Sequence, residues 1–538
     1  MKRVDLMRLF IDPRRKISKI DNKIYGHFLE HFHRIIYSGI YDPDNPLSDA
    51  RGLRQDVLDA LKDIHVPLIR WPGGCFASDY HWQYGIGKKR IAVYDKAWRV
   101  TEANAFGTNE FIDLCRKLGA EPYICTNAGT GTSEEMSNWV EYCNLDKGGY
   151  WSTKRIESGQ REPFHVHYWS IGNENYSDWE MGSKSADEWS RYVLESAKMM
   201  IRTDPTIELS AAALPDIDWD LGLLQTCSKR IQWVSVHKYW DEIYNTNDVA
   251  DYSKVMSYTT DLEAPVRRIR GILNALGLES SISVAFDEWN LRGWYHPNMF
   301  TDYQGRTPEE YLDPRNQNDN NSLYTLADAI FTGCVLNMFI RNSDLVKMAC
   351  YSPSVNVRGL IYTWKDGIVK RGQYYIFKLF TEYMGDRYIE SYNIDVLPAL
   401  YETHRNDSND AANEQLSGQS SNSFNVRAED DTKVDNAQQP IDALDFAATS
   451  FTGQNVLAIS MINKLPDESL PVSVELPENI VPISQCLYSV TGDGVDSYND
   501  IGQEKIQLHL NKPEKYTSQV VIPPASVNIV QIHYTPKA

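Results

Sequence analysis

The feature that most constrains the fold is a regular alternation of short apolar runs with amphipathic segments. Several of the apolar runs are continuous instead of alternating with polar residues, which is typical of strands buried on both faces of a parallel sheet. Most are followed by a segment of helical periodicity, as in residues 53–64 and 265–276. The eight runs are residues 24–32, 67–74, 122–129, 166–174, 208–214, 233–240, 281–290 and 344–353.

Eight strands that alternate with helices predict an α/β fold, a (β/α)8 (TIM) barrel, over residues 21–385. A doubly wound open sheet is the competing architecture. It is disfavoured because the sequence lacks the glycine-rich phosphate turns of nucleotide-binding folds. The segment NAGTGT (127–132) has no P-loop lysine, so it is interpreted as a βα turn.

The sequence changes in character after about residue 385. Short alternating apolar runs separated by Pro and Gly predict a C-terminal antiparallel β-sandwich over residues 386–538. The polar stretch 405–440 is expected to be a mobile insertion within it. Residues 1–20 contain one further strand-like run, which is expected to join the sandwich.

Composition narrows the classes of partner. The net charge of −19 disfavours nucleic acid and anionic membranes as partners and favours a neutral or cationic ligand. The sequence shows neither a signal peptide nor an apolar run of membrane-spanning length. The eight cysteines form no CxxC pair, so neither a zinc site nor a disulfide framework is expected. We therefore expect a cytoplasmic protein with free thiols.

Polar side chains follow most of the expected strands. In a (β/α)8 barrel the C-terminal strand ends converge on the active site. Carboxylates crowded there cost stability unless function requires them, because like charges disfavour ionisation. Paired carboxylates with no evident metal ligands indicate glycoside hydrolysis. The polar residues at these ends are Glu30, Arg70, Cys75, Asn173, Glu174, His237, Tyr239, Asp287 and Glu288, and Asp344 stands at the start of the last run.

A metal centre is the competing interpretation of these polar residues. His27, His31 and His33 lie close together in sequence, but we expect them to pack behind the site and not to bind metal. For a glycosidase, the stereochemical outcome depends on the gap between the two carboxyl groups. A gap of ~5–5.5 Å gives retention, and one of ~6.5–9.5 Å gives inversion.

Seven motifs, in order along the chain, carry a family resemblance. They are YGHFLEH (25–31), RWPGGCF (70–76), AWRVTEANAFGTNEF (97–111), NAGTGTSEEMSNWVEYCN (127–144), WSIGNEN (169–175), SVHKYW (235–240) and FDEWN (286–290). The chain resembles family 51 of the glycoside hydrolases, the intracellular α-L-arabinofuranosidases. The resemblance implies a retaining, exo-acting hydrolase that removes terminal non-reducing α-L-arabinofuranosyl residues from oligosaccharides. It implies no cofactor, no metal, and a homo-oligomer, by family a hexamer.

The resemblance also assigns roles, motif by motif. Glu174 in GNE looks like the general acid/base and Glu288 in FDEWN like the nucleophile. Arg70 and Tyr239 would keep Glu288 ionised, and His237 would orient Glu174 or the pocket. The groups expected to bind or enclose the furanose are Asn173 at the 2-hydroxyl, Glu30, the backbone at Gly74 and Cys75, and Trp98.

One departure from the family motivates a hypothesis about the sugar. The family reads a glutamine early in the last strand, where this chain has Asp344. The segment 292–307 is also rich in bulky and polar groups. An extra carboxylate near the glycone could accept a hydrogen bond from an additional hydroxyl, as in β-D-galactofuranose.

The same barrel is compatible with two further functions. One is a β-xylosidase or endo-glucanase, since the scaffold does not fix the substrate. The second is a non-catalytic carbohydrate-binding protein, which the intact Glu174 and Glu288 disfavour.

Overall fold

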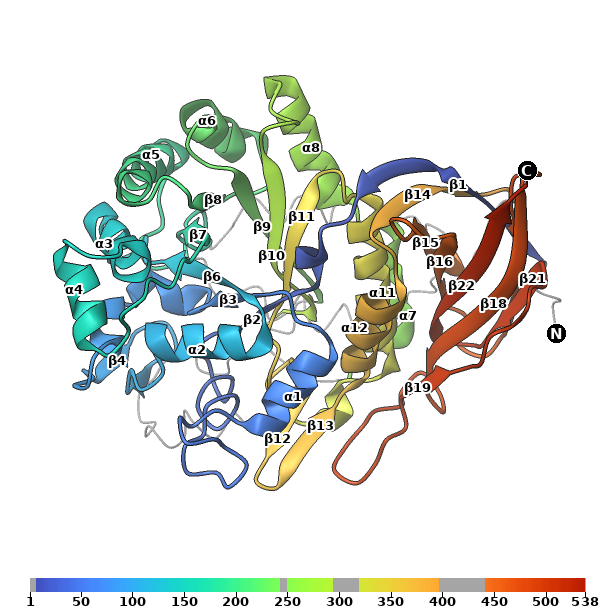
Figure 1. Cartoon of the computed structure of the whole chain (residues 1–538), viewed down its shortest axis with the longest axis horizontal. Coiled ribbons are helices and arrows are strands. Elements are labelled where there is room, and N and C mark those ends of the chain that lie inside the picture. The colour runs from blue at the N-terminus through green and yellow to red at the C-terminus, as the bar shows by residue number, and fades with distance from the viewer. Residues whose placement is uncertain (1–5, 242–248, 294–318, 396–440, 538) are drawn as a thin grey trace, which may run out of the picture.

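The predicted (β/α)8 barrel is confirmed. The computed structural model describes residues 6–241, 249–293, 319–395 and 441–537, and its eight parallel strands close in the order β10-β11-β2-β3-β6-β7-β8-β9 (Figure 1). These strands are β2 (Gly26–Phe28), β3 (Leu68–Trp71), β6 (Glu121–Thr126), β7 (Tyr168–Ile171), β8 (Glu208–Ala212), β9 (Trp233–Asp241), β10 (Ser283–Arg292) and β11 (Val346–Tyr351).

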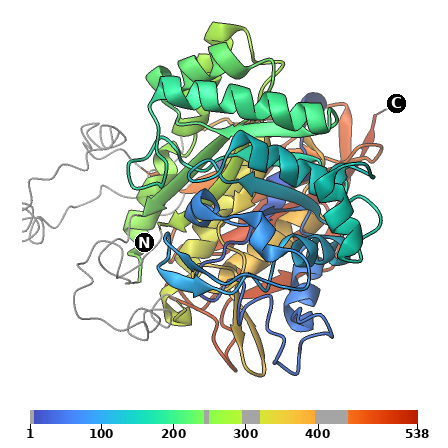
Figure 2. The same ribbon diagram turned by 90° about the vertical axis from the view of Figure 1, so that its left-hand side faces the viewer.

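Helices surround the barrel (Figure 2). In α5 (Ala186–Thr203) the side chains of Ser185 and Glu188 cap the first turn, and Trp189, Val193 and Ala197 bury one face at helical spacing. The other helices are α1 (Gln55–Asp63), α2 (Thr108–Leu118), α3 (Ser133–Asn144), α4 (Tyr150–Glu157), α6 (Ile217–Cys227), α7 (Tyr252–Ser257), α8 (Ala264–Leu276), α11 (Leu326–Arg341) and α12 (Gly372–Tyr383).

The loops contain short 3-10 helices and two β-hairpins. The 3-10 helices are η1 (Asn22–Tyr25), η2 (Cys75–Asp79), η3 (Trp82–Gly85), η4 (Tyr258–Asp261) and η5 (Asn321–Leu323). The hairpins are β4 (Val93–Asp95) with β5 (Val100–Glu102), and β12 (Ile361–Trp364) with β13 (Gly367–Lys370).

A second sheet, mainly antiparallel, follows the barrel. Its order is β19-β18-β22-β16-β15-β14-β1-β17-β21, with β20 paired to β18. The N-terminal strand β1 pairs antiparallel with β14 and parallel with β17. One apolar core joins side chains of distant strands in this order, so the sheet folds over itself. Its strands are β1 (Met7–Lys19), β14 (Arg387–Asn393), β15 (Leu444–Ser450), β16 (Val456–Asn463), β17 (Leu470–Glu475), β18 (Ile480–Thr491), β19 (Gln507–Leu510), β20 (Glu514–Lys515), β21 (Gln519–Ile522) and β22 (Ser526–Pro536).

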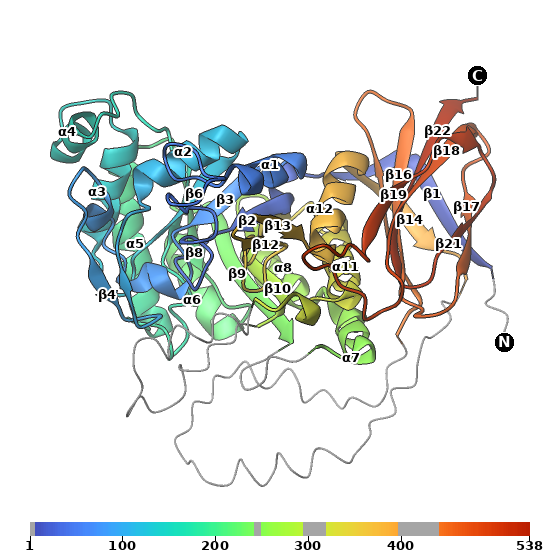
Figure 3. The same ribbon diagram turned by 90° about the horizontal axis from the view of Figure 1, so that it is seen from below.

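Helices α11 and α12 lie between the barrel and the second sheet (Figures 1 and 3). Every residue of α11 except Arg341 is buried, because one side of the helix faces the barrel and the other faces the sheet. Among the described residues, no helix has the length and apolar character needed to cross a membrane. The predicted insertion 405–440 and nearly all of the segment 292–307 lie outside the described residues.

Candidate active site

Glu288 lies on β10 and is held by two donors. Arg70 Nη1 donates to Oε2 at 2.7 Å, and the Tyr239 hydroxyl donates to Oε1 at 2.7 Å. Burial alone would raise the pKa of Glu288, but the charges of His237 and Arg70 hold it below its usual range. The site therefore keeps Glu288 ionised, as a nucleophile requires.

Glu174 follows β7 and reaches the same pocket. Its backbone φ of 43° lies in the left-handed region, a strained conformation for a non-glycine residue that is concentrated at functional sites. His237 Nδ1 lies 2.8 Å from Glu174 Oε1, and Trp179 Nε1 donates to Oε2 at 3.4 Å. Carboxylate oxygens of Glu174 and Glu288 and a nitrogen of His237 all lie within 4.8 Å of one another.

The His237 ring lies between three carboxylates, those of Glu174, Asp287 and Glu288. Burial would lower its pKa, but Glu288, Asp287 and Glu174 together raise the pKa of His237 to about 10. Asp287 is fully buried and accepts hydrogen bonds from the Tyr123 and Ser235 hydroxyls, each at 2.7 Å. Its Oδ1 lies 3.4 Å from His237 Nε2, so Asp287 fixes the imidazole that contacts Glu174.

Glu30 follows β2 and contacts the turn after β3. Its Oε1 accepts from the backbone N–H groups of Gly74 and Phe76 at 3.1 Å and from Trp98 Nε1 at 3.2 Å. Burial, and then the charge of Glu288, raise the pKa of Glu30 to about 8. At neutral pH Glu30 therefore carries a proton and can both donate and accept hydrogen bonds.

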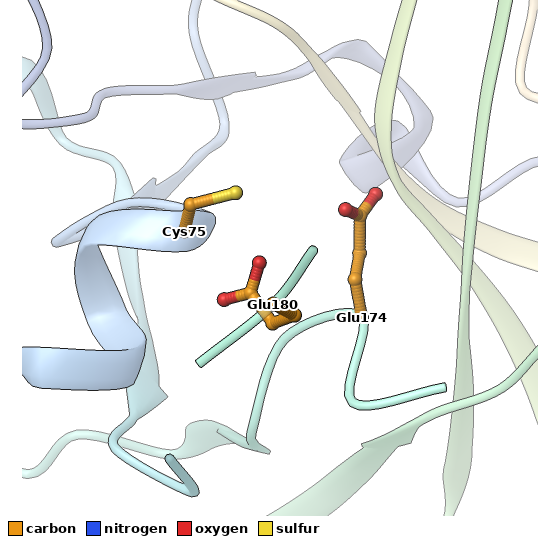
Figure 4. Close-up of side chains that lie close together, drawn as sticks. All are labelled: Cys75, Glu174 and Glu180. Atoms are coloured by element: carbon orange, nitrogen blue, oxygen red, sulfur yellow. The ribbon is translucent and has the colours of Figure 1, made fainter. Parts of the chain in front are cut away.

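The side chains of Cys75, Glu180 and Glu174 lie close together (Figure 4). Glu180 accepts a hydrogen bond from the Ser78 hydroxyl, and burial together with Glu174 raises the pKa of Glu180 to about 7. One ligand atom from each of the three lies within 4.8 Å of the others, a spacing that a metal ion could use. The same is true of Glu174, His237 and Glu288. Both sets share Glu174, so a cation in either would occupy the proposed acid.

The three N-terminal histidines belong to neither of these two sets. His31 Nδ1 lies 3.0 Å from Glu102, and Trp71 Nε1 donates to His31 Nε2 at 3.1 Å. His27 is buried, which lowers its pKa to about 3 and keeps the ring neutral. These contacts fit the expected packing role of His27 and His31.

The structure places Asp344 away from the site, so its prediction as a substrate-binding residue is wrong. Asp344 precedes the first residue of β11, at the opposite end of the barrel, and pairs with Arg270 at 2.5 and 3.0 Å. A residue before a parallel strand cannot reach the edge where the strands end. The hypothesis that Asp344 selects a larger furanose is therefore wrong as well.

Several residues that surround Glu174 and Glu288 were not predicted from the sequence. Ser352, just after β11, has its hydroxyl 2.8 Å from that of Tyr239. Trp179 is 43% exposed and contacts Glu174, and Glu180 lies beside Cys75. The signal for Ser352 was present in the sequence, because it is the polar residue at the C-terminal end of the last apolar run.

A closed (β/α)8 barrel whose strand ends bring together two carboxylates defines the class, a barrel glycoside hydrolase. Residues 60–257 match the family described as alpha-L-arabinofuranosidase 1 domain, and residues 287–526 match the alpha-L-arabinofuranosidase C-terminal domain. The chain belongs to the α-L-arabinofuranosidase family.

Named relatives and a solved structure agree with this assignment. An intracellular exo-α-(1→5)-L-arabinofuranosidase of Halalkalibacterium halodurans is 36% identical over 67% of this chain and 72% of that protein. Alpha-L-arabinofuranosidase C of Emericella nidulans is 36% identical over 70% of this chain and 74% of that protein. The arabinose complex of the Thermotoga maritima α-L-arabinofuranosidase matches with a TM-score of 0.79 and 31% identity, covering 98% of this chain and 100% of that one.

Proposed function

We propose that this protein is a retaining, exo-acting α-L-arabinofuranosidase that removes terminal non-reducing α-L-arabinofuranosyl residues from arabinose-containing oligosaccharides. The observation that carries the proposal is the close approach of Glu174 and Glu288, with oxygens within 4.8 Å. This spacing supports retention, because inversion needs room for a water between the carboxylates, at ~6.5–9.5 Å.

In the first step Glu288 attacks the anomeric carbon while Glu174 gives its proton to the leaving oxygen. The bond to the leaving group breaks as a covalent glycosyl-enzyme ester forms. In the second step Glu174, now a carboxylate, takes a proton from water, and the resulting hydroxide displaces Glu288 from the anomeric carbon. His237 holds Glu174 in place. Arg70 and Tyr239 stabilise Glu288 as a carboxylate, the form that attacks the anomeric carbon.

The remaining polar groups are suited to bind the furanose. Asn173 Oδ1 accepts from Arg70 Nη2 at 2.8 Å, while its buried Nδ2 has no partner among the described residues. That free N–H supports a hydrogen bond to the sugar 2-hydroxyl, a contact that strengthens in the transition state. Glu30, the backbone at Gly74 and Cys75, and the Trp98 wall would complete the glycone subsite.

A panel of aryl glycosides tests the proposal. Wild type is expected to release the aryl alcohol from the α-L-arabinofuranoside, with the first-formed sugar retaining its anomeric configuration by NMR. Glu288→Ala should abolish release. Preference for a β-D-galactofuranoside, a β-xyloside or a glucan would redirect the assignment, and no release from any substrate would favour a binding protein. Activity should be unchanged by EDTA, since no step requires a cofactor or metal.

We also propose that the protein is cytoplasmic and forms a homo-oligomer, a hexamer by family resemblance. The location is supported by bacterial relatives that are named intracellular. Cell fractionation with activity assay tests the location, and light scattering coupled to size exclusion tests the assembly. A monomer at micromolar concentration would contradict the proposed assembly.

A further inference from the structure

Arg358 is a buried arginine without the hydrogen bonds that burial normally demands. The residue is 5% exposed, and its Nε and Nη1 have no acceptor among the described residues. Removing a charged donor from water without a partner costs more than almost any other polar burial. Such an arrangement persists where function requires it.

Three other deeply buried arginines in the described part of the chain donate hydrogen bonds from their guanidinium groups, and Arg70 Nε, which makes none, lies 3.5 Å from the Asp287 carboxylate. Arg292 donates to the Asp328 carboxylate at 2.7 Å, and Arg155 donates to the Tyr142 carbonyl at 2.8 Å. Arg371 donates to the carbonyls of Val357 and Gly359, at 2.9 and 2.8 Å. These two carbonyls flank Arg358 on either side, and Asn290 Nδ2 donates to the Arg358 carbonyl at 3.3 Å. The backbone of Arg358 is therefore anchored, while its guanidinium is not.

The guanidinium of Arg358 belongs to the glycone pocket. Its Cζ lies 5.5 Å from the centre of the Tyr239 ring, and the Tyr239 hydroxyl is the group that donates to Glu288 Oε1. Burial lowers the pKa of Arg358, and the negative charge of Glu288 opposes this shift. The unpartnered donors thus belong to a guanidinium that packs over Tyr239 and lies within electrostatic range of Glu288.

The residues around Glu288 fall into two groups, according to which of its two carboxylate oxygens they approach. Arg70 and Gly74 lie on the Oε2 side, together with Asn173, which is bonded to Arg70. Tyr239 and Arg358 lie on the Oε1 side. The anomeric carbon of a furanose is bonded to C2 and to the ring oxygen. If Asn173 binds the 2-hydroxyl, the ring oxygen and the C4 substituent face the Oε1 side.

Of the two oxygens on that side, the exocyclic one suits a cation better. The ring oxygen gains positive charge in the oxocarbenium-like transition state, so a guanidinium against it would raise the barrier. The hydroxyl on the exocyclic carbon stays neutral throughout the reaction and can accept two N–H groups.

From this geometry, and resting on the proposed arabinofuranosidase activity, we propose that Arg358 is a substrate-binding residue whose guanidinium donates to the exocyclic 5-hydroxyl of the furanosyl glycone. The 5-hydroxyl of the bound sugar would be the acceptor for the Arg358 donors. Arg358 would therefore select furanosides that carry this hydroxyl.

The test compares 4-nitrophenyl α-L-arabinofuranoside with its 5-deoxy analogue in wild type and in Arg358→Met. Wild type is expected to lose roughly ten- to hundredfold in kcat/KM on the 5-deoxy substrate, as for a hydrogen bond to a charged group. Arg358→Met should show that loss already on the parent substrate and almost no further loss on the analogue. The 2-deoxy analogue serves as the control and should lose equally in both enzymes.

Thermal unfolding separates a binding role from a structural one. Arg358→Met should keep or raise Tm, because it removes an unpartnered buried charge. The matched variant Arg371→Met should lower Tm, because it breaks bonds to backbone carbonyls. Arg358→Lys keeps the charge and should recover part of the activity.

Three results would overturn the inference. Equal 5-deoxy losses in wild type and Arg358→Met would mean that Arg358 does not contact this hydroxyl. A Tm drop in Arg358→Met as large as that in Arg371→Met would make the residue structural. No turnover of any arabinofuranoside by wild type would overturn the proposed function, and this inference with it, whereas the first two results leave the proposed function intact.

Discussion

Glu174 and Glu288 differ in their surroundings, and the difference suits them to different roles. Glu288 accepts from Arg70 and Tyr239, which stabilise its anion, whereas Glu174 contacts His237 and the partly exposed Trp179 nearer the pocket mouth. The acid is needed only when the leaving group is a poor one.

We therefore predict that Glu174→Gln loses roughly 10²- to 10⁴-fold in kcat/KM on alkyl or sugar leaving groups. On 2,4-dinitrophenyl arabinofuranoside, which departs without a proton, bond cleavage to the glycosyl-enzyme should be nearly unaffected. A series of aryl arabinofuranosides of graded leaving-group acidity measures this. A uniform loss across the series would contradict the role of Glu174 as the acid.

The raised pKa of Glu30 makes a prediction about stability against pH. Its folded-state pKa of about 8 lies above the ordinary value of 4.5, so folding favours the protonated form. The folded state holds this proton more tightly than the unfolded state, so the contribution of Glu30 to stability declines as pH rises from 4.5 to 8.

Glu30→Gln keeps the acceptor for Gly74, Phe76 and Trp98 but cannot ionise. The Tm difference between this variant and wild type should therefore shift in favour of the variant from about pH 4.5 to 8, and stay constant at higher pH. Differential scanning fluorimetry in matched buffers measures it. A difference that does not change with pH would mean that Glu30 has an ordinary pKa.

At the scale of elements, the turn after β3 controls how closely the backbone approaches the carboxylates. A Cβ added at Gly74 would lie 3.0 Å from Glu288 Oε2 and 3.5 Å from the Asn173 amide. Both side chains are fixed by Arg70, so neither can yield without misplacing the nucleophile.

Gly74→Ala should therefore lower kcat/KM roughly ten- to hundredfold, as expected for a small displacement of a reacting group. Gly271 in α8 provides the control, since a Cβ there meets no atom within 4 Å. Gly271→Ala should stabilise the fold by about 0.5–1 kcal/mol through helix propensity and leave kcat/KM unchanged. Equal kinetics for the two variants would contradict the close approach.

The strands themselves were predictable, because parallel strands covered on both faces must be apolar along their whole length. Each of the eight runs overlaps one barrel strand. The polar residues at their C-terminal ends, Glu174 and Glu288 among them, meet in the pocket. The prediction for Asp344 was wrong because this residue begins an apolar run instead of ending one. Arg358 could not be found in this way, since it lies in a loop past β11 and its significance rests on missing partners that only coordinates reveal.

At the scale of the molecule, the barrel and the second sheet share buried elements. The sequence predicted that residues 1–20 join the C-terminal sheet, but not that β1 would link β14 to β17, because pairing between such distant segments leaves no local pattern. A Cβ added at Gly333 of α11 would lie 3.0 Å from Ile462 of β16, and Arg341 Nη1 donates to Asp445 at 3.1 Å. Such contacts predict that the two parts unfold as one cooperative unit.

Tryptophan fluorescence can test this coupling, because all 14 tryptophans precede residue 385 and report on the barrel alone. Leu470 is fully buried in the sheet core on β17, and Leu470→Ala should cost about 2–5 kcal/mol. In a coupled molecule the free energy of unfolding measured by fluorescence in urea falls by this full amount, and the fluorescence midpoint falls with it and coincides with the midpoint from far-UV circular dichroism. Leu510→Ala, at an exposed position of β19, should shift neither. The contradicting result is a fluorescence midpoint in Leu470→Ala that stays at the wild-type value while circular dichroism shows a transition at lower urea. The sheet would then unfold alone, and α11 would not couple the stability of the sheet to that of the barrel.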